Sequence, residues 1–179
     1  MKLISVVVPC YNEQEVLPMF YDEIIKVSDG MKKEHNDIDF EFLFINDGSK
    51  DRTLEIFREL ADKDKRVRYI SYSRNFGKES GMYAGLKNCK GDYVVVMDAD
   101  LQHPPALIPD MLSGIKEGYD CCAAKRTDRK GEAPIRSFFS RMFYRLNRRM
   151  TNIDLVQGAV DFRIMTRQMV EAVLDLSER

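Results

Sequence analysis

Short apolar runs recur along the chain at the spacing expected for buried β-strands. Each run is rich in β-branched or aromatic residues and is bounded by polar or glycine-containing turns. The runs cover residues 3–8, 40–45, 67–72 and 93–97. We therefore predict four strands in the first part of the chain.

The segments between these runs carry apolar residues at helical spacing, over residues 16–27, 54–60 and 80–87. Strands that alternate with helices in this way indicate an α/β fold with a mostly parallel, doubly wound, Rossmann-like sheet flanked by helices. The later part of the chain predicts a helix at 106–115, a short strand at 119–124 and a last helix at 168–176.

Polar side chains follow each of the four predicted strands. In a parallel sheet the carboxyl ends of the strands share one edge, and ligands bind in the crevice outside that edge. Carboxylates, amides and a lysine are therefore expected to meet there. The residues are Pro9, Tyr11, Asn12 and Glu13; Asn46, Asp47, Gly48 and Ser49; Arg74, Asn75, Gly77 and Lys78; and Asp98, Asp100, Gln102 and His103.

Two carboxylates, Asp98 and Asp100, follow the fourth apolar run. Residues two apart at a strand end can point to the same side, so both can reach one ligand. Mg²⁺ and Mn²⁺ prefer oxygen ligands and are commonly held by one or two carboxylates together with substrate phosphates. Gln102 offers a third oxygen, and His103 is a candidate nitrogen ligand or nearby donor. An isolated Asp-x-Asp is more often an exposed turn, but the polar strand ends around it favour a metal site.

Two further strand-end residues have both a binding and a structural interpretation. The carboxylate of Asp47 can accept hydrogen bonds from a nucleobase or a ribose hydroxyl. Its segment, Asn-Asp-Gly-Ser, is also a good turn before a helix that Ser49 or Asp51 can cap. Lys78 lies at a predicted helix start, where an ammonium and free backbone N–H groups can face a pyrophosphate. A lone lysine is more often a solvated surface charge.

Composition excludes several classes of protein. The 179 residues suffice for one α/β domain, and the formal net charge of −1 gives no support for binding nucleic acid. The four cysteines lack Cys-x-x-Cys spacing and, with only two histidines, suggest reduced thiols in an intracellular setting rather than a zinc site. The apolar start is too short for a signal peptide, and no run approaches the ~20 apolar residues of a membrane span.

Taken together, the four motifs resemble the family 2 glycosyltransferases, and within them the branch of dolichol-phosphate mannose synthase and bactoprenol glucosyltransferase. The matching segments are Val8-Pro9-Cys10-Tyr11-Asn12-Glu13, Asn46-Asp47-Gly48-Ser49, Arg74-Asn75-Phe76-Gly77-Lys78-Glu79 and Asp98-Ala99-Asp100-Leu101-Gln102-His103-Pro104-Pro105. The resemblance covers essentially the whole chain. It implies a GT-A fold, a UDP- or GDP-sugar donor, a divalent metal ion, Mg²⁺ or Mn²⁺, and inversion at the anomeric carbon.

Residue roles follow from the resemblance motif by motif. The donor would contact Pro9, Tyr11, Asn12, Glu13, Asp47, Lys78, Asp98 and Ala99. The metal ion would be bound by Asp98, Asp100 and Gln102. Residues 158–163 resemble the later acidic motif beside the acceptor, so Asp161 joins Asp100 as a candidate catalytic residue.

The task of Asp161 depends on the acceptor. A phosphomonoester has a second pKa of about 6 and is already mostly ionised at neutral pH, so Asp161 would only orient it. A hydroxyl acceptor requires a general base, and Asp161 would then be indispensable.

A basic segment lies between the fourth motif and the acidic one. Residues 125–150 contain nine Lys or Arg residues and only two acidic ones. Within 134–150 the apolar residues have helical spacing, typical of a helix at a membrane interface but also of an ordinary amphipathic helix packed on the sheet. We expect its arginines to favour anionic lipid head groups, and Arg126, Arg129 and Arg136 to bind the acceptor phosphate.

We therefore expect one catalytic domain over residues 1–179, with 1–105 as the nucleotide-sugar and metal half and 106–179 as the acceptor half. In relatives of this branch, transmembrane helices often follow the catalytic domain. Here they would lie beyond Arg179 and would anchor the full-length protein at the cytoplasmic face of the cell membrane.

The leading hypothesis is transfer of a hexose from a nucleotide diphosphate sugar, with UDP favoured, to a polyprenyl phosphate. Two alternatives stay open: transfer to a sugar or protein hydroxyl, and a non-catalytic domain that binds nucleotide sugar or scaffolds a membrane complex. A homo-oligomer is also left open. A nicotinamide-dependent oxidoreductase is disfavoured because no Gly-x-Gly-x-x-Gly follows the first predicted strand. A processive polysaccharide synthase is disfavoured because the chain has no tryptophan and so no Gln-x-x-Arg-Trp.

Overall fold

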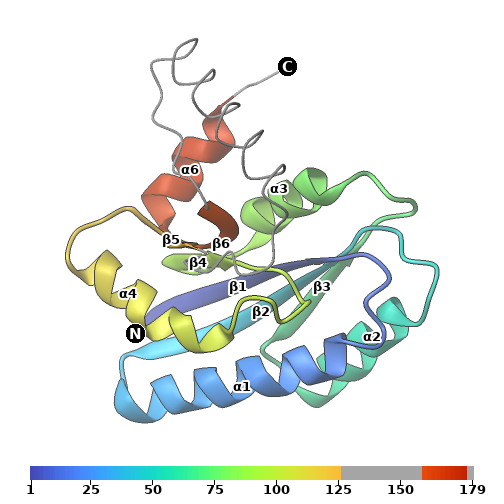
Figure 1. The fold of residues 1–179 in the computed structure, drawn as a ribbon, viewed down its shortest axis with the longest axis horizontal. Coiled ribbons are helices and arrows are strands. Elements are labelled where there is room, and N and C mark those ends of the chain that lie inside the picture. Colours follow the sequence, from blue (N-terminus) through green and yellow to red (C-terminus); the bar gives the residue numbers. More distant parts are fainter. Residues whose placement is uncertain (126–158, 177–179) are drawn as a thin grey trace, which may run out of the picture. The chain divides into compact units, whose positions relative to one another are not determined.

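The computed structural model describes residues 1–125 and 159–176, with Ala159 and Val160 described by their backbone alone (Figure 1). Its strands are β1 (Lys2–Cys10), β2 (Ile38–Asn46), β3 (Val67–Ser71), β4 (Tyr93–Val96), β5 (Cys121–Lys125) and β6 (Ala159–Thr166). Its helices are α1 (Leu17–Glu34), α2 (Thr53–Lys63), α3 (Lys78–Asn88), the short 3-10 helix η1 (Pro105–Leu107), α4 (Ile108–Lys116) and α6 (Arg167–Asp175).

By its internal packing the chain divides into two units. One consists of Met1–Ala123 with Asp161–Arg179, and the other of residues 124–160. All side-chain contacts, clefts and grooves described below belong to the first unit. The division into a donor half and an acceptor half stays a prediction.

The strands form one sheet in the order β3-β2-β1-β4-β6-β5. The pairs β1–β2, β2–β3 and β1–β4 are parallel, which confirms the predicted mostly parallel α/β fold. β6 is antiparallel to β4 and was not predicted as a strand. Because β1 has β2 on one side and β4 on the other, the strand order reverses at β1, and a crevice is expected at the carboxyl ends of β1 and β4.

Phenylalanines form the core between the sheet and the helices α1 and α2, which lie on the same side of the sheet in Figure 1. Alternation along β2 directs Phe40, Phe42 and Phe44 to this side. The ring of Phe44 lies 6.3 Å from that of Phe20 in α1 and 5.1 Å from that of Phe57 in α2. All five rings are buried, and each contributes about 1.5–3 kcal/mol relative to an exposed side chain.

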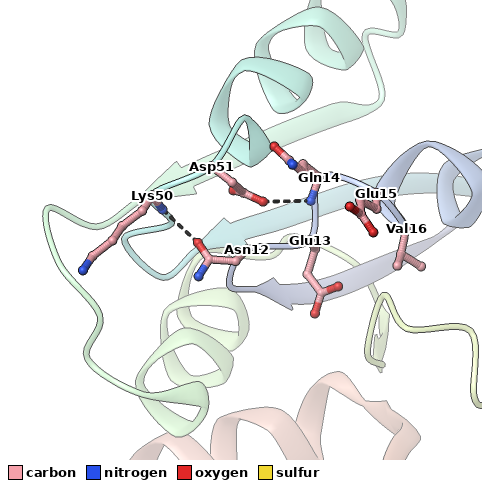
Figure 2. A pocket seen from close by; sticks show the side chains of 7 residues that line it. All are labelled: Asn12, Glu13, Gln14, Glu15, Val16, Lys50 and Asp51. Carbon is pink, nitrogen blue, oxygen red and sulfur yellow. Dashed lines mark hydrogen bonds between the residues drawn. The ribbon is translucent and has the colours of Figure 1, made fainter.

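The loops that follow β1 and β2 are joined by hydrogen bonds between side chains and backbone. Asn12 Oδ1 accepts from Lys50 N at 2.9 Å, and Gln14 N donates to Asp51 Oδ2 at 3.1 Å (Figure 2). Asp51 Oδ1 also accepts from Thr53 N at 3.0 Å, so the side chain that binds the start of α2 is that of Asp51, one residue before the N-cap Arg52, and not that of Ser49. These bonds fix two of the four strand ends relative to each other.

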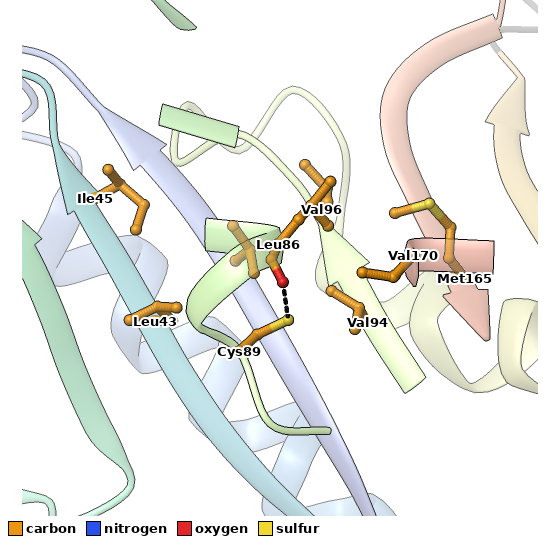
Figure 3. Close-up of a cluster of buried hydrophobic side chains, with 9 residues drawn as sticks. Leu43, Ile45, Leu86, Cys89, Val94, Val96, Met165 and Val170 are labelled. Carbon is orange, nitrogen blue, oxygen red and sulfur yellow. Dashed lines mark hydrogen bonds between the residues drawn. The ribbon is translucent and has the colours of Figure 1, made fainter. Parts of the chain in front are cut away.

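Aliphatic side chains fill the opposite side of the sheet, beneath α3 and α6 (Figure 3). The buried cluster consists of Val7, Leu43, Ile45, Leu86, Cys89, Val94, Val96, Met165 and Val170. A Cβ atom at Gly85 would overlap the side chain of Val7, so glycine at this position lets α3 lie close to β1. This close packing sets the first residue of α3, Lys78, at the carboxyl edge of the sheet.

Candidate active site

The carboxyl ends of β1, β2 and β4 and the start of α3 surround a cleft of about 360 Å³. It lies where the strand order reverses, the usual ligand site of open α/β sheets. Its walls are Pro9, Cys10, Tyr11, Glu13, Asp47, Asn75, Gly77, Lys78, Asp98, Ala99 and Asp100. The structure thus brings together all predicted donor-binding residues except Asn12.

Asn12 lines a neighbouring pocket of about 520 Å³, which it shares with Glu13, Lys50 and Asp51 (Figure 2). Its backbone is left-handed, with φ of 56°, and its N–H donates to Ser49 Oγ at 3.0 Å. In this structure Asn12 holds the loops after β1 and β2 together. Its contact with a donor stays a prediction.

Asp47 is 3% exposed and holds the loop between β3 and α3. Its Oδ1 accepts from Phe76 N at 2.7 Å, and its Oδ2 accepts from Gly77 N at 2.9 Å. A carboxylate oxygen has two lone pairs, so each still has one acceptor position that could face a nucleotide. In this structure Asp47 therefore fixes the loop between β3 and α3, which forms part of the wall of the cleft.

Lys78 joins two carboxylates that come from different elements. Its Nζ lies 2.7 Å from Asp98 Oδ1 after β4 and 2.8 Å from Asp161 Oδ2 in β6. The register explains the arrangement, since Val96 pairs with Arg163 across the antiparallel ladder and the next side chains outward on the two strands are Asp98 and Asp161. We name this arrangement the Asp98–Lys78–Asp161 bridge.

Within the bridge, the pKa values of Asp161 and Lys78 are shifted. The hydrogen bond from Lys78 holds the pKa of the Asp161 carboxyl below its usual range, despite partial burial that acts the other way. Partial burial lowers the pKa of the Lys78 ammonium, but the hydrogen bonds to Asp161 and Asp98 outweigh it and the pKa is raised. Both groups are therefore charged at neutral pH.

Arg163 extends the charged group along β6. Its Nη2 lies 3.6 Å from Asp161 Oδ1, and its Nε donates to the Asp161 carbonyl oxygen at 3.4 Å. Arg163 belongs to the 158–163 motif but was not predicted as a site residue. The available signal was its place two residues after Asp161, because alternate residues of a strand share a face.

The predicted metal ligands lie on the turn after β4. Asp100 Oδ1 accepts from Gln102 N at 3.0 Å across Leu101, whose φ is 57°. Burial and the negative charges of Asp100, Asp98 and Asp51 raise the pKa of the nearby Glu13 carboxyl.

That accumulated negative charge, together with the oxygen donors of Asp98, Asp100 and Gln102, fits a hard divalent cation whose remaining ligands are phosphate oxygens or water. Within the part of the chain that the structure describes, no three His, Cys, Asp or Glu side chains are arranged as a metal site. His103, the other candidate ligand, has its ring 6.3 Å from that of Phe162.

An apolar groove of about 740 Å³, with Asp161 among its lining residues, lies on the side of the sheet that carries α3 and α6. Its lining residues are Tyr72, Glu79, Ser80, Met82, Tyr83, Leu86, Val96, Cys121, Asp161, Arg163, Met165, Met169, Val173 and Leu176. Lys78 lines the cleft and Asp161 lines the groove, so the bridge stands between the two spaces.

Several predicted features lie outside the described residues. These are the phosphate-binding candidates Arg126, Arg129 and Arg136 and the basic amphipathic segment 134–150. Among the described helices, none has the length and apolar character needed to cross a membrane.

The sheet topology and the carboxylate pair at the point where the strand order reverses are those of the GT-A fold. A solved structure supports this fold class. The glucosyl-3-phosphoglycerate synthase of Mycobacterium tuberculosis, in complex with Mn²⁺, UDP-glucose and phosphoglyceric acid, aligns with 94% of this chain and 58% of its own, with a TM-score of 0.66 and 23% identity. More particularly, the chain belongs to glycosyl transferase family 2, which it matches over residues 5–174. The predicted family and fold class are confirmed.

Two relatives show where in the family the chain lies. The uncharacterized glycosyltransferase YkcC of Bacillus subtilis (strain 168) is 44% identical over 175 residues, which are 98% of this chain and 53% of that protein. The bactoprenol glucosyl transferase of Shigella phage SfV is 38% identical over 176 residues, or 98% of this chain and 56% of that protein. The chain spans about half the length of these relatives.

Proposed function

We propose that the chain is the catalytic domain of an inverting glycosyltransferase at the cytoplasmic face of a membrane. It transfers a hexose from a nucleotide diphosphate sugar, with UDP favoured, to a polyprenyl phosphate. The observation that carries the proposal is the Asp98–Lys78–Asp161 bridge, because it stands between a cleft lined by carboxylates and a lysine, which suits the donor, and an apolar groove, which suits a lipid. Membership of the family supports glycosyl transfer, and the bactoprenol glucosyl transferase relative supports the acceptor.

The donor's diphosphate would bind at the turn after β4. Asp98, Asp100 and Gln102 would hold Mg²⁺ or Mn²⁺, which supplies positive charge to the leaving nucleotide diphosphate. Asp47 fixes the loop that carries Gly77, so the wall of the cleft is formed before the donor binds and costs little reorganisation.

In the transfer step, an acceptor oxygen forms a bond to the anomeric carbon on the face opposite the diphosphate. The bond from that carbon to the diphosphate oxygen breaks, and its electron pair stays with the leaving group. A phosphate acceptor is already mostly ionised at neutral pH, so no proton needs to be removed. Arg163, which lines the groove, would face the anionic acceptor, while Asp161 holds Arg163 and Lys78 in place.

The groove beside Asp161 supports a lipid acceptor. Its methionines, Met82, Met165 and Met169, are unbranched and adaptable, which suits a flexible isoprenoid chain. A sugar or protein hydroxyl acceptor would leave this apolar surface without a role in the reaction.

The test is an assay with radiolabelled UDP-glucose, Mn²⁺ and a polyprenyl phosphate in detergent. The expected product is extractable into organic solvent and labile to mild acid. No such product with any lipid acceptor, together with label on a sugar or protein hydroxyl, would contradict the polyprenyl acceptor. The Asp100→Ala variant gives the background.

The donor can be chosen in a separate measurement. Thermal shift with Mn²⁺ and UDP-glucose, UDP-N-acetylglucosamine or GDP-mannose should give the largest stabilisation with a UDP-sugar. Stabilisation by a donor without turnover on any acceptor would indicate the non-catalytic binding domain instead.

A further inference from the structure

We propose that Lys78 is a positioning residue that couples the donor site to Asp161. Without donor, its ammonium bridges Asp98 and Asp161, offsets one of their two negative charges and competes with the metal ion for Asp98. When the metal-bound donor binds, the ammonium leaves Asp98 for the diphosphate and stays paired with Asp161. The inference rests on the proposed function and adds a coupling between its two substrate sites.

The geometry makes Lys78 a competitor for the metal ligand. Its Nζ lies 2.7 Å from Asp98 Oδ1 and 2.8 Å from Asp98 Oδ2, so it covers both oxygens of that carboxylate. A divalent cation bound to the same oxygens would lie within a few ångströms of the ammonium. Like charges at that distance repel, and the lysine must therefore move.

The side chain of Lys78 can move while its backbone stays fixed. The preceding Gly77 N–H and Phe76 N–H are both bound to Asp47, which is buried. The Lys78 side chain itself is 38% exposed and has a flexible four-carbon stem. The ammonium can therefore swing about a fixed Cα from a carboxylate to a phosphate.

Because Lys78 is also bound to Asp161, its movement changes the charge at the groove proposed for the acceptor. Asp161 Oδ2 lies 2.8 Å from the same ammonium, so the position of Lys78 sets how much negative charge the groove presents. With donor bound, the ammonium between Asp161 and the diphosphate would fix Asp161 at the reacting end of the groove. The acceptor site is then completed only after the donor has bound.

The first test measures Mn²⁺ binding to the protein alone by calorimetry. Lys78→Met removes the competing charge and should tighten Mn²⁺ binding about tenfold. Lys78→Arg keeps the charge and should leave the affinity near that of the wild type. The matched control is Lys87→Met, which removes an exposed lysine from the other end of the same helix and should change nothing.

The second test measures binding of UDP, and separately GDP, at saturating Mn²⁺. One of the two nucleotides is expected to bind the wild type. Lys78→Met should lower the affinity for that nucleotide about tenfold, because a phosphate contact is lost. A double-mutant cycle with Asp161→Asn should show that the two substitutions are not additive. A residue that only binds nucleotide would give additive effects.

The outcomes separate this inference from the proposed function. Unchanged or weaker Mn²⁺ binding in a folded Lys78→Met protein overturns the competition, and additive effects in the cycle overturn the coupling. Thermal unfolding checks the fold, and Lys78→Gln serves as the neutral variant if the methionine variant does not fold. Failure of the wild type to transfer sugar overturns the proposed function but leaves the Mn²⁺ result standing.

Discussion

Carboxylates lie near both ends of β4, and they are bound in different ways. Beside the loop that leads into the strand, Glu41 is 7% exposed and accepts hydrogen bonds from Ser5 Oγ, Lys90 N and Arg68 Nη1. Beyond the other end, the side chains of Asp98 and Asp161 are 30% and 46% exposed and share the ammonium of Lys78.

The difference separates a structural carboxylate from one suited to a ligand. Three of the four acceptor positions of Glu41 are taken by neutral and charged donors from β1, β3 and the loop before β4, and its side chain is buried, so a ligand would gain little there. Asp98 and Asp161 keep exposed oxygens and a cation that can be displaced. A carboxylate at a strand end is therefore a candidate ligand only if the fold leaves its hydrogen bonds incomplete.

The largest effect is expected at the carboxyl end of β4, from Asp100→Ala. Loss of a metal ligand should lower turnover by about 10³-fold or more and abolish Mn²⁺-dependent nucleotide binding, without a change in the unfolding temperature. Steady-state kinetics and calorimetry measure both. Asp62→Ala, on the exposed part of α2, is the control. Unchanged turnover in Asp100→Ala would refute the metal assignment. It would also contradict the claim that the carboxylates beyond the carboxyl end of β4 bind a ligand.

Asp161→Asn is expected to have the next largest effect. With a polyprenyl phosphate acceptor, turnover should fall about 10²-fold, because the amide no longer holds Lys78 and Arg163 as a carboxylate does. Measured kcat and KM for both substrates locate the loss, and Asp175→Asn at the end of α6 is the control. A loss to background with a hydroxyl acceptor would indicate instead that Asp161 is a general base.

Glu41→Gln tests the other end of the strand and should act on stability alone. The substitution replaces a buried carboxylate that accepts three hydrogen bonds and leaves the partly exposed Arg68 guanidinium without its charged partner, so it should cost about 2 kcal/mol of unfolding free energy. Urea unfolding measures the cost. Glu55→Gln, which removes an exposed ion pair with Arg52, should cost nothing measurable. Loss of turnover per folded molecule in Glu41→Gln would contradict the division between the two ends.

The smallest effect concerns pH. Burial raises the pKa of the Glu41 carboxyl, but hydrogen bonds from Ser5, Lys90 N and Arg68 outweigh it, and the pKa in the folded protein is lowered from 4.5. The stabilising contribution of Glu41 is therefore present above that ordinary value and is lost as pH falls through the folded value. The stability difference between wild type and Glu41→Gln should shrink when urea unfolding is repeated below pH 4.5. A constant difference would show that the Glu41 charge is not stabilised by the fold.

The carboxyl edge of the sheet was predictable because the signal there is local. Each of the first four strands is an apolar run, and each polar group follows directly, so topology alone brings Pro9, Asp47, Lys78 and Asp98 to one cleft. The elements before residue 105 were placed within a few residues, apart from α1, which extends to Glu34 rather than ending near residue 27.

That Asp98 and Asp161 lie opposite each other was not predictable in the same way. It depends on the antiparallel register of β6 against β4, and pairing between distant segments leaves no local pattern. Apolar Phe162 and Ile164 alternate with charged Asp161 and Arg163, a pattern compatible with a strand that was not predicted and that carries no information on its partner or direction. The hydrogen bonds of Asp47 were hidden for a similar reason, because they depend on the path of a loop 29 residues further along the chain.

Gly48 shows that a harmful change in this protein need not touch any charged group. Its φ is +65°, and a Cβ atom there would overlap the backbone of Arg74 and lie 2.6 Å from Asn75 N. Even alanine would push away the loop that Asp47 holds, while every carboxylate and lysine of the cleft keeps its identity. A survey of natural variants that checks only the catalytic side chains would class such a substitution as harmless, although it should abolish function by displacing the loop.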